Sequence, residues 1–290
     1  MTAGELSAPA VVVTGATGAV GRHVARALAR RGPVRSLVRD PGKAEALGIG
    51  GEIVVGDYRD GAGLERAFTG AGAVFVVTAD PLRPQDDAHI LDAARAAGVR
   101  RAVKLSWLAV ADPRANDLVA RWNRESERLL RSSGLAWTVL RMRTPMSNTL
   151  SWAASIRRES VVRALGGDAR TACVDPRDVA EAAVRALTEP EHAGRTYALT
   201  GPELLSARAQ TATLARVLGR PVGFEELTPE QALARWSARL PRPVAQALLE
   251  AAQRRQAGES AEVEGDLGGL LRRPPTTFAV WAADHASAFG

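Results

Sequence analysis

The sequence contains a single cysteine, Cys173, and four scattered histidines. One cysteine excludes an intramolecular disulfide, and the histidines do not have the spacing of metal ligands. We therefore expect neither a disulfide framework nor a metal site.

Long apolar runs are missing as well. No run reaches the roughly 18 residues that a membrane-spanning helix needs. Residues 1–10 are polar and lack the charged and apolar regions of a signal peptide. We therefore expect a cytoplasmic protein with no membrane partner.

The positive charge is not gathered into a patch. The formal net charge is +6, but the arginines are spread along the 290 residues, and no basic run has interleaved aromatics. This pattern argues against nucleic-acid binding. A solvated basic surface explains it better than an anionic, phosphate-bearing ligand does, although the second explanation stays open.

A glycine-rich turn near the N-terminus carries the clearest chemical signal. Residues 11–13 are all valine and predict a short buried strand, and a helical pattern with one apolar face covers residues 20–28. Between them, Gly15 allows a sharp turn, Gly18 removes a Cβ where a pyrophosphate would approach, and Gly21 allows close packing of the helix. The N-terminus of such a helix attracts phosphate. The turn therefore predicts dinucleotide binding, with the spacing GxxGxxG.

Further strands alternate with helices along the first two thirds of the chain. They are expected at residues 33–38, 52–56, 73–78, 101–108 and 135–140. This alternation is typical of an α/β fold with a Rossmann-like, doubly wound parallel sheet that binds its ligand at the carboxyl ends of the strands.

The residues after the second predicted strand bear on the cofactor. Arg39 follows the strand directly, and Lys43 comes four residues later. A guanidinium at this place suits the 2′-phosphate of NADP, whereas an acidic residue would bind the 2′-hydroxyl of NAD. Asp40 leaves the second alternative open, but the pattern favours NADP (NADPH).

The pattern changes at Gly201. Helices are expected at residues 206–218, 228–240 and 241–256, without further strand–helix alternation. We predict an NAD(P)-binding Rossmann-like domain over residues 8–200 and a mainly helical substrate cap over residues 201–290. Part of residues 142–170, which begin within the loop predicted after the strand at 135–140, should join the cap.

Seven motifs together resemble the NmrA-like branch of the atypical short-chain dehydrogenase/reductases, and the similarity covers nearly the whole chain. In chain order they are TGATGAVG, LVRDPGKA, GDYRD, AVFVVTAD, VKLSWLAV, SGLAWTVLRMR and DPRDVAEAAVRAL. The C-terminal part is similar to ergot-alkaloid iminium and aldehyde reductases. The quinone reductases and NADP-sensing regulators of the same branch are similar too.

The resemblance implies a role for each matching position. The positions implied to bind the cofactor are Gly15, Thr17, Gly18, Val20, Gly21, Arg39, Lys43, Asp57, Tyr58, Thr78 and Ala79. Among these, Asp57 and Tyr58 would lie near adenine. Lys104 and Ser106 would lie beside the nicotinamide, and the positions implied to face substrate are Met142, Met146 and Asn148.

The sequence departs from this family in its catalytic residues. Ordinary short-chain reductases use a Tyr with a Lys four residues later, but Tyr58 and Tyr197 are the only tyrosines and neither has that Lys. Asn123 occupies the position where related members place His or Lys, and it cannot titrate. Asn123, Ser106 and Lys104 are the candidate catalytic residues, with a surface position as the alternative for Asn123.

A site without an acidic Tyr suits some electrophiles better than others. Iminium carbons, quinones and activated enones do not need a strong acid, whereas simple ketones do. We therefore predict an NADPH-dependent oxidoreductase that acts on such a small molecule as a monomer or homodimer, with secondary metabolism suggested by the ergot-alkaloid resemblance. The alternatives are a non-catalytic NADP sensor of the NmrA type and a cofactor-retaining isomerase or cyclase.

Overall fold

Seven strands form one sheet in the order β3-β2-β1-β4-β5-β6-β8. The computed structural model describes residues 9–258 and 262–290. The strands of this sheet are β1 (Ala10–Val13), β2 (Val34–Val38), β3 (Glu52–Val55), β4 (Ala71–Val76), β5 (Arg101–Trp107), β6 (Ala136–Met142) and β8 (Arg195–Leu199). Strand β1 pairs in parallel with β2 and β4, as do β2 with β3 and β4 with β5. This order confirms the predicted Rossmann-like, doubly wound sheet.

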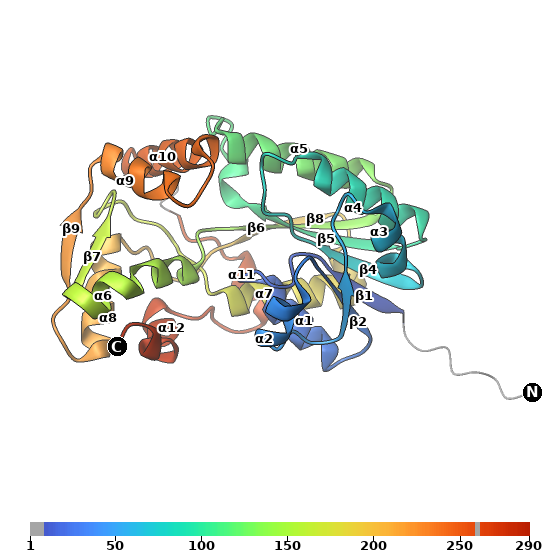
Figure 1. Ribbon diagram of the computed structural model, residues 1–290, viewed down its shortest axis with the longest axis horizontal. Helices are drawn as coiled ribbons and strands as arrows, with labels where there is room; N and C mark the ends of the chain where they lie inside the picture. Colours follow the sequence, from blue (N-terminus) through green and yellow to red (C-terminus); the bar gives the residue numbers. More distant parts are fainter. Residues whose placement is uncertain (1–8, 259–261) are drawn as a thin grey trace, which may run out of the picture. The chain divides into compact units, whose positions relative to one another are not determined.

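Helices connect these strands and continue to the C-terminus (Figure 1). The α-helices of the described residues are α1 (Gly21–Ala29), α2 (Pro41–Ala46), α3 (Gly61–Phe68), α4 (Gln85–Ala96), α5 (Leu118–Ser132), α6 (Ala153–Glu159), α7 (Pro176–Thr188), α8 (Ala207–Leu218), α9 (Pro229–Ser237), α10 (Arg242–Gln256), α11 (Asp266–Leu271) and α12 (Phe278–Asp284). Short 3-10 helices are η1 (Leu108–Ala111), η2 (Met146–Trp152), η3 (Pro190–His192) and η4 (Ala286–Ala288). No helix among the described residues is long and apolar enough to cross a membrane.

The chain divides into two compact units. Among the described residues, the first comprises residues 9–106, 124–140 and 180–197, and the second comprises residues 107–123, 141–179, 198–258 and 262–290. The predicted domain boundary at residue 200 stays a prediction, and its first domain begins at residue 8, just outside the described residues.

The core of the first unit lies between the sheet and α3, α4 and α5 (Figure 1). Phe68 of α3, Ile90 of α4 and Leu130 of α5 are fully buried against Val12 and Val74 of the sheet. These helices cover one face because their apolar residues recur at helical spacing. The other face is covered by α1 and α2.

The second unit contains a small sheet that the sequence pattern does not indicate. Strands β7 (Val161–Ala164) and β9 (Gly223–Glu226) pair in parallel, so the mainly helical region predicted after residue 201 also contains one short strand, β9. Strand β9 has the sequence GFEE and little apolar content, and its pairing partner lies about sixty residues earlier in the chain. The hydrophobic core of the second unit contains residues from α6, α8 and α12, including Ile156, Leu214 and Trp281.

Candidate functional site

The glycine turn has the local geometry that its sequence predicts. Gly15 has a φ of +59°, and a Cβ there would lie 2.9 Å from the carbonyl oxygen of Val77. A Cβ on Gly21 would lie only 2.2 Å from the Gly15 oxygen, so the start of α1 packs directly on the turn. Gly18 is different, because its Cβ would meet only the Gly15 oxygen, at 3.1 Å, and the residue is exposed. The space beside Gly18 is therefore open to a ligand.

Helix α1 begins without a side-chain cap. Its N-cap residue is Val20, which has no side-chain oxygen and is itself buried. The first N–H groups of a helix need acceptors, and a phosphate is a favourable one. Thr17, half-buried in the turn, adds a hydroxyl nearby in the chain. The donor set at this helix end therefore fits a dinucleotide pyrophosphate.

The two residues directly after β2, Arg39 and Asp40, differ in their contacts. Arg39 is exposed, and in the part of the chain that the structure describes its guanidinium has no hydrogen-bond or ion-pair partner. The Asp40 carboxylate instead accepts the backbone N–H of Lys43 at 3.0 Å and caps α2. Lys43 itself is exposed.

Asp57 and Tyr58 have partners within the protein. The Asp57 carboxylate bonds the guanidinium groups of Arg59 and Arg83, each at 3.0 Å, and the bond to Arg59 is the main reason why its pKa lies far below the usual range. The Tyr58 hydroxyl accepts the N–H of Gly15 at 3.1 Å. Burial raises the Tyr58 pKa, so this hydroxyl stays protonated. Tyr58 thus lies against the glycine turn; its predicted place near adenine remains a prediction.

A buried ion pair joins the middle of β5 to α4, beside the end of β4. The Lys104 ammonium lies 2.8 Å from the Asp87 carboxylate, with side-chain exposures of 2% and 1%. Asp87 also accepts the hydroxyls of Thr78 at 2.9 Å and Ser126 at 2.7 Å, and Lys104 donates to Thr78 at 3.2 Å. Thr78 and Lys104, both predicted at the cofactor, are thus joined through Asp87, which Ser126 supports in turn; sequence reasoning missed both Asp87 and Ser126. Ala79, which follows Thr78, is exposed.

Asp87 carries a signal in the sequence that could have identified it. It lies on the same helical stripe as Ile90, Leu91 and Ala94, which are buried. A carboxylate on an apolar stripe must have a buried partner, because an uncompensated buried charge is costly.

The other two candidate catalytic side chains are both engaged. The Ser106 hydroxyl donates a hydrogen bond to the buried Glu127 carboxylate at 2.7 Å, and Arg131 forms an ion pair with that carboxylate at 2.9 Å. Asn123 is 5% exposed and donates to the carbonyl of Val119, four residues earlier, at 2.9 Å. The alternative of a surface position for Asn123 is therefore wrong.

The predicted substrate contacts lie in the second unit. Met142 is the last residue of β6 rather than part of the following loop, so the loop predicted directly after residue 140 begins two residues too early. Met146 is 1% exposed in the core cluster with Ile156 and Trp281. Asn148 is exposed. Their contact with substrate remains a prediction.

Comparisons with known proteins identify a family and named relatives that bind or use NAD(P)H or reduce a substrate. A family model described as NAD(P)H-binding matches residues 15–190. A (4-alkanoyl-5-oxo-2,5-dihydrofuran-3-yl)methyl phosphate reductase from Streptomyces griseus is 54% identical over 279 residues, which cover 96% of this chain and 99% of that protein. An NAD(P)H azoreductase from Xenophilus azovorans is 35% identical over 286 residues, covering 97% and 99%.

A comparison with solved structures also finds an NAD(P)H-dependent reductase. An NADPH-dependent quinone oxidoreductase from Escherichia coli, complexed with NADPH, superposes with a TM-score of 0.81 at 28% identity and covers 94% of this chain and 99% of that one. The chain therefore belongs to the NAD(P)H-binding family, and the resemblance to the NmrA-like reductases is confirmed. Within this family it is an NAD(P)H-dependent oxidoreductase that acts on an electrophile.

Proposed function

We propose that the protein uses NADPH to reduce the conjugated double bond of a phosphate-bearing butenolide. Two features support NADPH over NADH: Arg39 offers an exposed guanidinium, and the Asp40 carboxylate is occupied in capping α2. An unpaired guanidinium suits a 2′-phosphate, whereas NAD selection requires an available acid.

The substrate class comes from the relative that is 54% identical. Its name describes a five-membered lactone with a ring double bond, a methyl phosphate on one alkene carbon and an alkanoyl group on the other. The alkanoyl-bearing carbon lies between two carbonyl groups. Addition of a hydride to the opposite alkene carbon therefore moves the double-bond electrons onto a 1,3-dicarbonyl unit.

The hydrogen bond from Ser106 to Glu127 is the observation that carries this proposal. Because the Ser106 hydroxyl donates to a buried carboxylate at 2.7 Å, it is not available as a proton donor. Tyr58 is engaged at the glycine turn, and the Tyr197 hydroxyl lies 2.8 Å from the His192 ring. None of these three hydroxyl groups is poised to protonate a developing alkoxide.

A butenolide of this kind needs no such acid. A bound reduced nicotinamide supplies the hydride. The electron pair released from the double bond is stabilised as a dicarbonyl enolate, and the carbon between the carbonyls then takes a proton from water. The remaining task of the chain is orientation, since positioning alone lowers a barrier substantially. The buried Lys104–Asp87 pair, beside the end of β4, is suited to that task.

A comparison of acceptors tests the proposal. NADPH oxidation would be followed with an alkanoyl butenolide phosphate, the corresponding alcohol, a naphthoquinone and cyclohexanone. We expect the phosphate to be reduced most efficiently, with the label of deuterated NADPH delivered to the alkene carbon that bears the methyl phosphate. Efficient reduction of cyclohexanone, turnover of the quinone alone, or no NADPH oxidation with any acceptor would contradict the proposal.

A further inference from the structure

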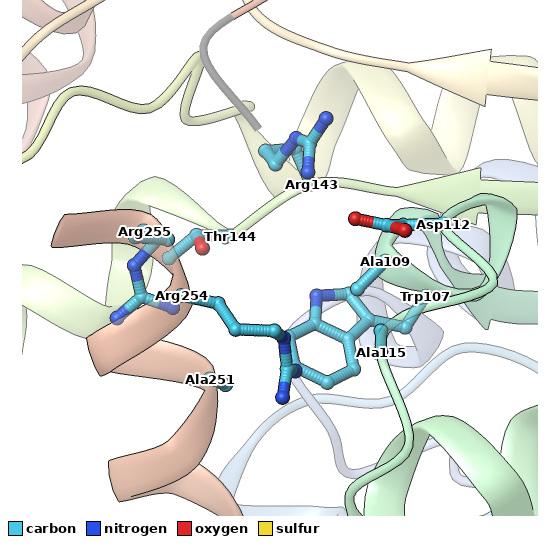
Figure 2. Close-up of a pocket in the computed structure, with 9 residues that line it drawn as sticks. All are labelled: Trp107, Ala109, Asp112, Ala115, Arg143, Thr144, Ala251, Arg254 and Arg255. Carbon is cyan, nitrogen blue, oxygen red and sulfur yellow. The ribbon is translucent and has the colours of Figure 1, made fainter. Parts of the chain in front are cut away.

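A pocket in the second unit gathers positive charge. Three segments line it: residues 107–115, residues 143–144, and the C-terminal turns of α10 at residues 251–255. Figure 2 shows arginine side chains from two of these segments around the opening, with Trp107 and Asp112 on the third. None of these residues belongs to the glycine turn or to the ion-pair network.

Arg143 is the most deeply placed of the arginines. It is 7% exposed, its backbone N–H donates to the carbonyl of Leu199 at 2.9 Å, and its side-chain Nε has no hydrogen-bond partner among the described residues. Burial lowers the pKa of the guanidinium, while the charges of Glu262 and Glu264 act in the opposite direction. Neither glutamate forms an ion pair with it within the described part of the chain. A buried guanidinium without a counter-charge is costly unless a ligand supplies one.

Arg255 adds a second guanidinium to the lining, at a half-buried position. Its neighbour Arg254 pairs with the buried Asp117 carboxylate, so that charge is compensated. Arg255 has no side-chain partner in the residues that the structure describes, and burial together with the charges of Arg143 and Arg254 lowers its pKa.

The remaining lining residues are compatible with an anion. The Asp112 carboxylate is engaged by the Arg114 side chain at 3.0 Å and by its backbone N–H at 2.9 Å. Thr144 offers a hydroxyl, and Trp107 offers an apolar wall. Arginine binds phosphate with a planar fork of N–H donors, so two of them with a hydroxyl match a dianionic monoester better than a planar carboxylate.

We propose that Arg143 and Arg255 form an anion subsite that binds the phosphate monoester of the substrate. The choice of substrate rests on the proposed function, but the subsite itself is carried by two arginines at one pocket, Arg143 buried and Arg255 half-buried, neither with an ion-pair partner among the described residues. It would make the chain select phosphorylated over dephosphorylated forms of one electrophile.

Binding of a simple monoester tests the subsite without turnover. Butyl phosphate would be titrated calorimetrically into protein saturated with NADP⁺, which occupies the other phosphate-binding region. We expect wild type to bind it, and Arg255→Gln and Arg143→Lys to bind it about tenfold to a hundredfold more weakly, as expected for loss of charge-assisted hydrogen bonds. Arg143→Lys keeps the buried positive charge but loses the planar fork of N–H donors. Weaker binding in this variant is therefore not explained by a folding defect caused by loss of the charge.

Arg242→Gln is the matched control. It removes the same charge from the exposed first turn of the same helix, thirteen residues and therefore about 20 Å from Arg255. At physiological salt a charge at that distance is screened, so butyl phosphate affinity should be unchanged. Equal weakening in Arg242→Gln and Arg255→Gln, or unchanged affinity in both pocket variants, would overturn the subsite.

Kinetics separate the two proposals. With the butenolide phosphate, Arg255→Gln should raise KM about tenfold or more and leave KM for the dephosphorylated alcohol unchanged. Monoester binding through these arginines without butenolide reduction would refute the proposed function and leave the subsite standing. Butenolide phosphate reduction with no change of KM in either pocket variant would refute the subsite and leave the function standing.

Discussion

The Lys104 ammonium and the Asp87 carboxylate form an ion pair at 2.8 Å, and both side chains are almost completely buried. Asp87 is bonded further to Thr78 and Ser126, so one carboxylate connects the loop after β4, strand β5 and helix α5. This arrangement holds the end of β4 and the middle of β5 where a nicotinamide is expected, because each partner fixes the orientation of the next.

Breaking this pair should destabilise the protein strongly. Asp87→Asn leaves Lys104 buried without a counter-charge, and the free energy of unfolding should fall by about 3–5 kcal/mol in urea denaturation. The double variant Asp87→Asn/Lys104→Met should recover much of the loss, since it removes both charges. Asp92→Asn is the control on the same helix, because its pair with Arg95 is exposed and should contribute at most about 1 kcal/mol. Additive losses in the double variant would contradict this role.

Arg39 should determine the preference for NADPH. Because its guanidinium has no partner among the described residues, Arg39→Ala should disturb little else. Loss of a charge-assisted hydrogen bond should weaken NADPH binding about tenfold to a hundredfold, with a much smaller change for NADH. Fluorescence titration of both cofactors measures this, with Arg31→Ala as an exposed control. A wild-type preference for NADH, or equal loss of both cofactors, would refute the assignment.

Gly18 and Gly21 should respond differently to added side chains. Gly18→Val should abolish NADPH binding while the protein stays folded, since the new side chain projects into the open space beside the turn. Gly21→Ala should lower the melting temperature, because its Cβ would lie 2.2 Å from the Gly15 oxygen. Thermal unfolding combined with NADPH titration distinguishes the two effects. Retained NADPH affinity in Gly18→Val would exclude the turn as the pyrophosphate site.

Turnover should not depend on a tyrosine acid. Tyr58→Phe removes the acceptor of the Gly15 N–H, so the KM for NADPH should rise modestly. The kcat with a butenolide or quinone should stay within a few-fold in both Tyr58→Phe and Tyr197→Phe, because no acid contribution of about 10²–10⁴ is lost. A large decrease in kcat in either variant, with cofactor affinity intact, would show that a tyrosine donates the proton.

Cys173 should be unreactive in the folded protein. Burial raises the pKa of its thiol to about 12, and the Gln210 amide lies 3.2 Å from the sulfur. Since only the thiolate is nucleophilic, iodoacetamide should modify Cys173 slowly at pH 8 and rapidly in urea. The folded pKa is raised above the unfolded value of about 9, so folding stability should fall as the pH rises above about 9. Equal alkylation rates in folded and unfolded protein would contradict this.

Local pattern was enough to determine the nucleotide-binding half of this protein. Three valines, a glycine turn and an apolar helical stripe define β1, Gly15–Gly21 and α1, because each signal lies within a few residues and needs no distant partner. The position of Arg39 directly after β2 was also predicted from local pattern. Strand β9 escaped prediction because its four residues contain a single large apolar side chain, Phe224, and its pairing partner β7 lies about sixty residues earlier.

The tertiary structure decided which side chains are available for chemistry. Ser106, Lys104 and Tyr58 are ordinary polar residues in the sequence, and only the fold shows that Glu127, Asp87 and the Gly15 N–H engage them. Likewise, Arg143 and Arg255 are two of many arginines, separated by more than a hundred residues. Their charges become significant only because folding places both at one pocket, buries Arg143 and leaves neither with an ion-pair partner among the described residues, which no local pattern reports.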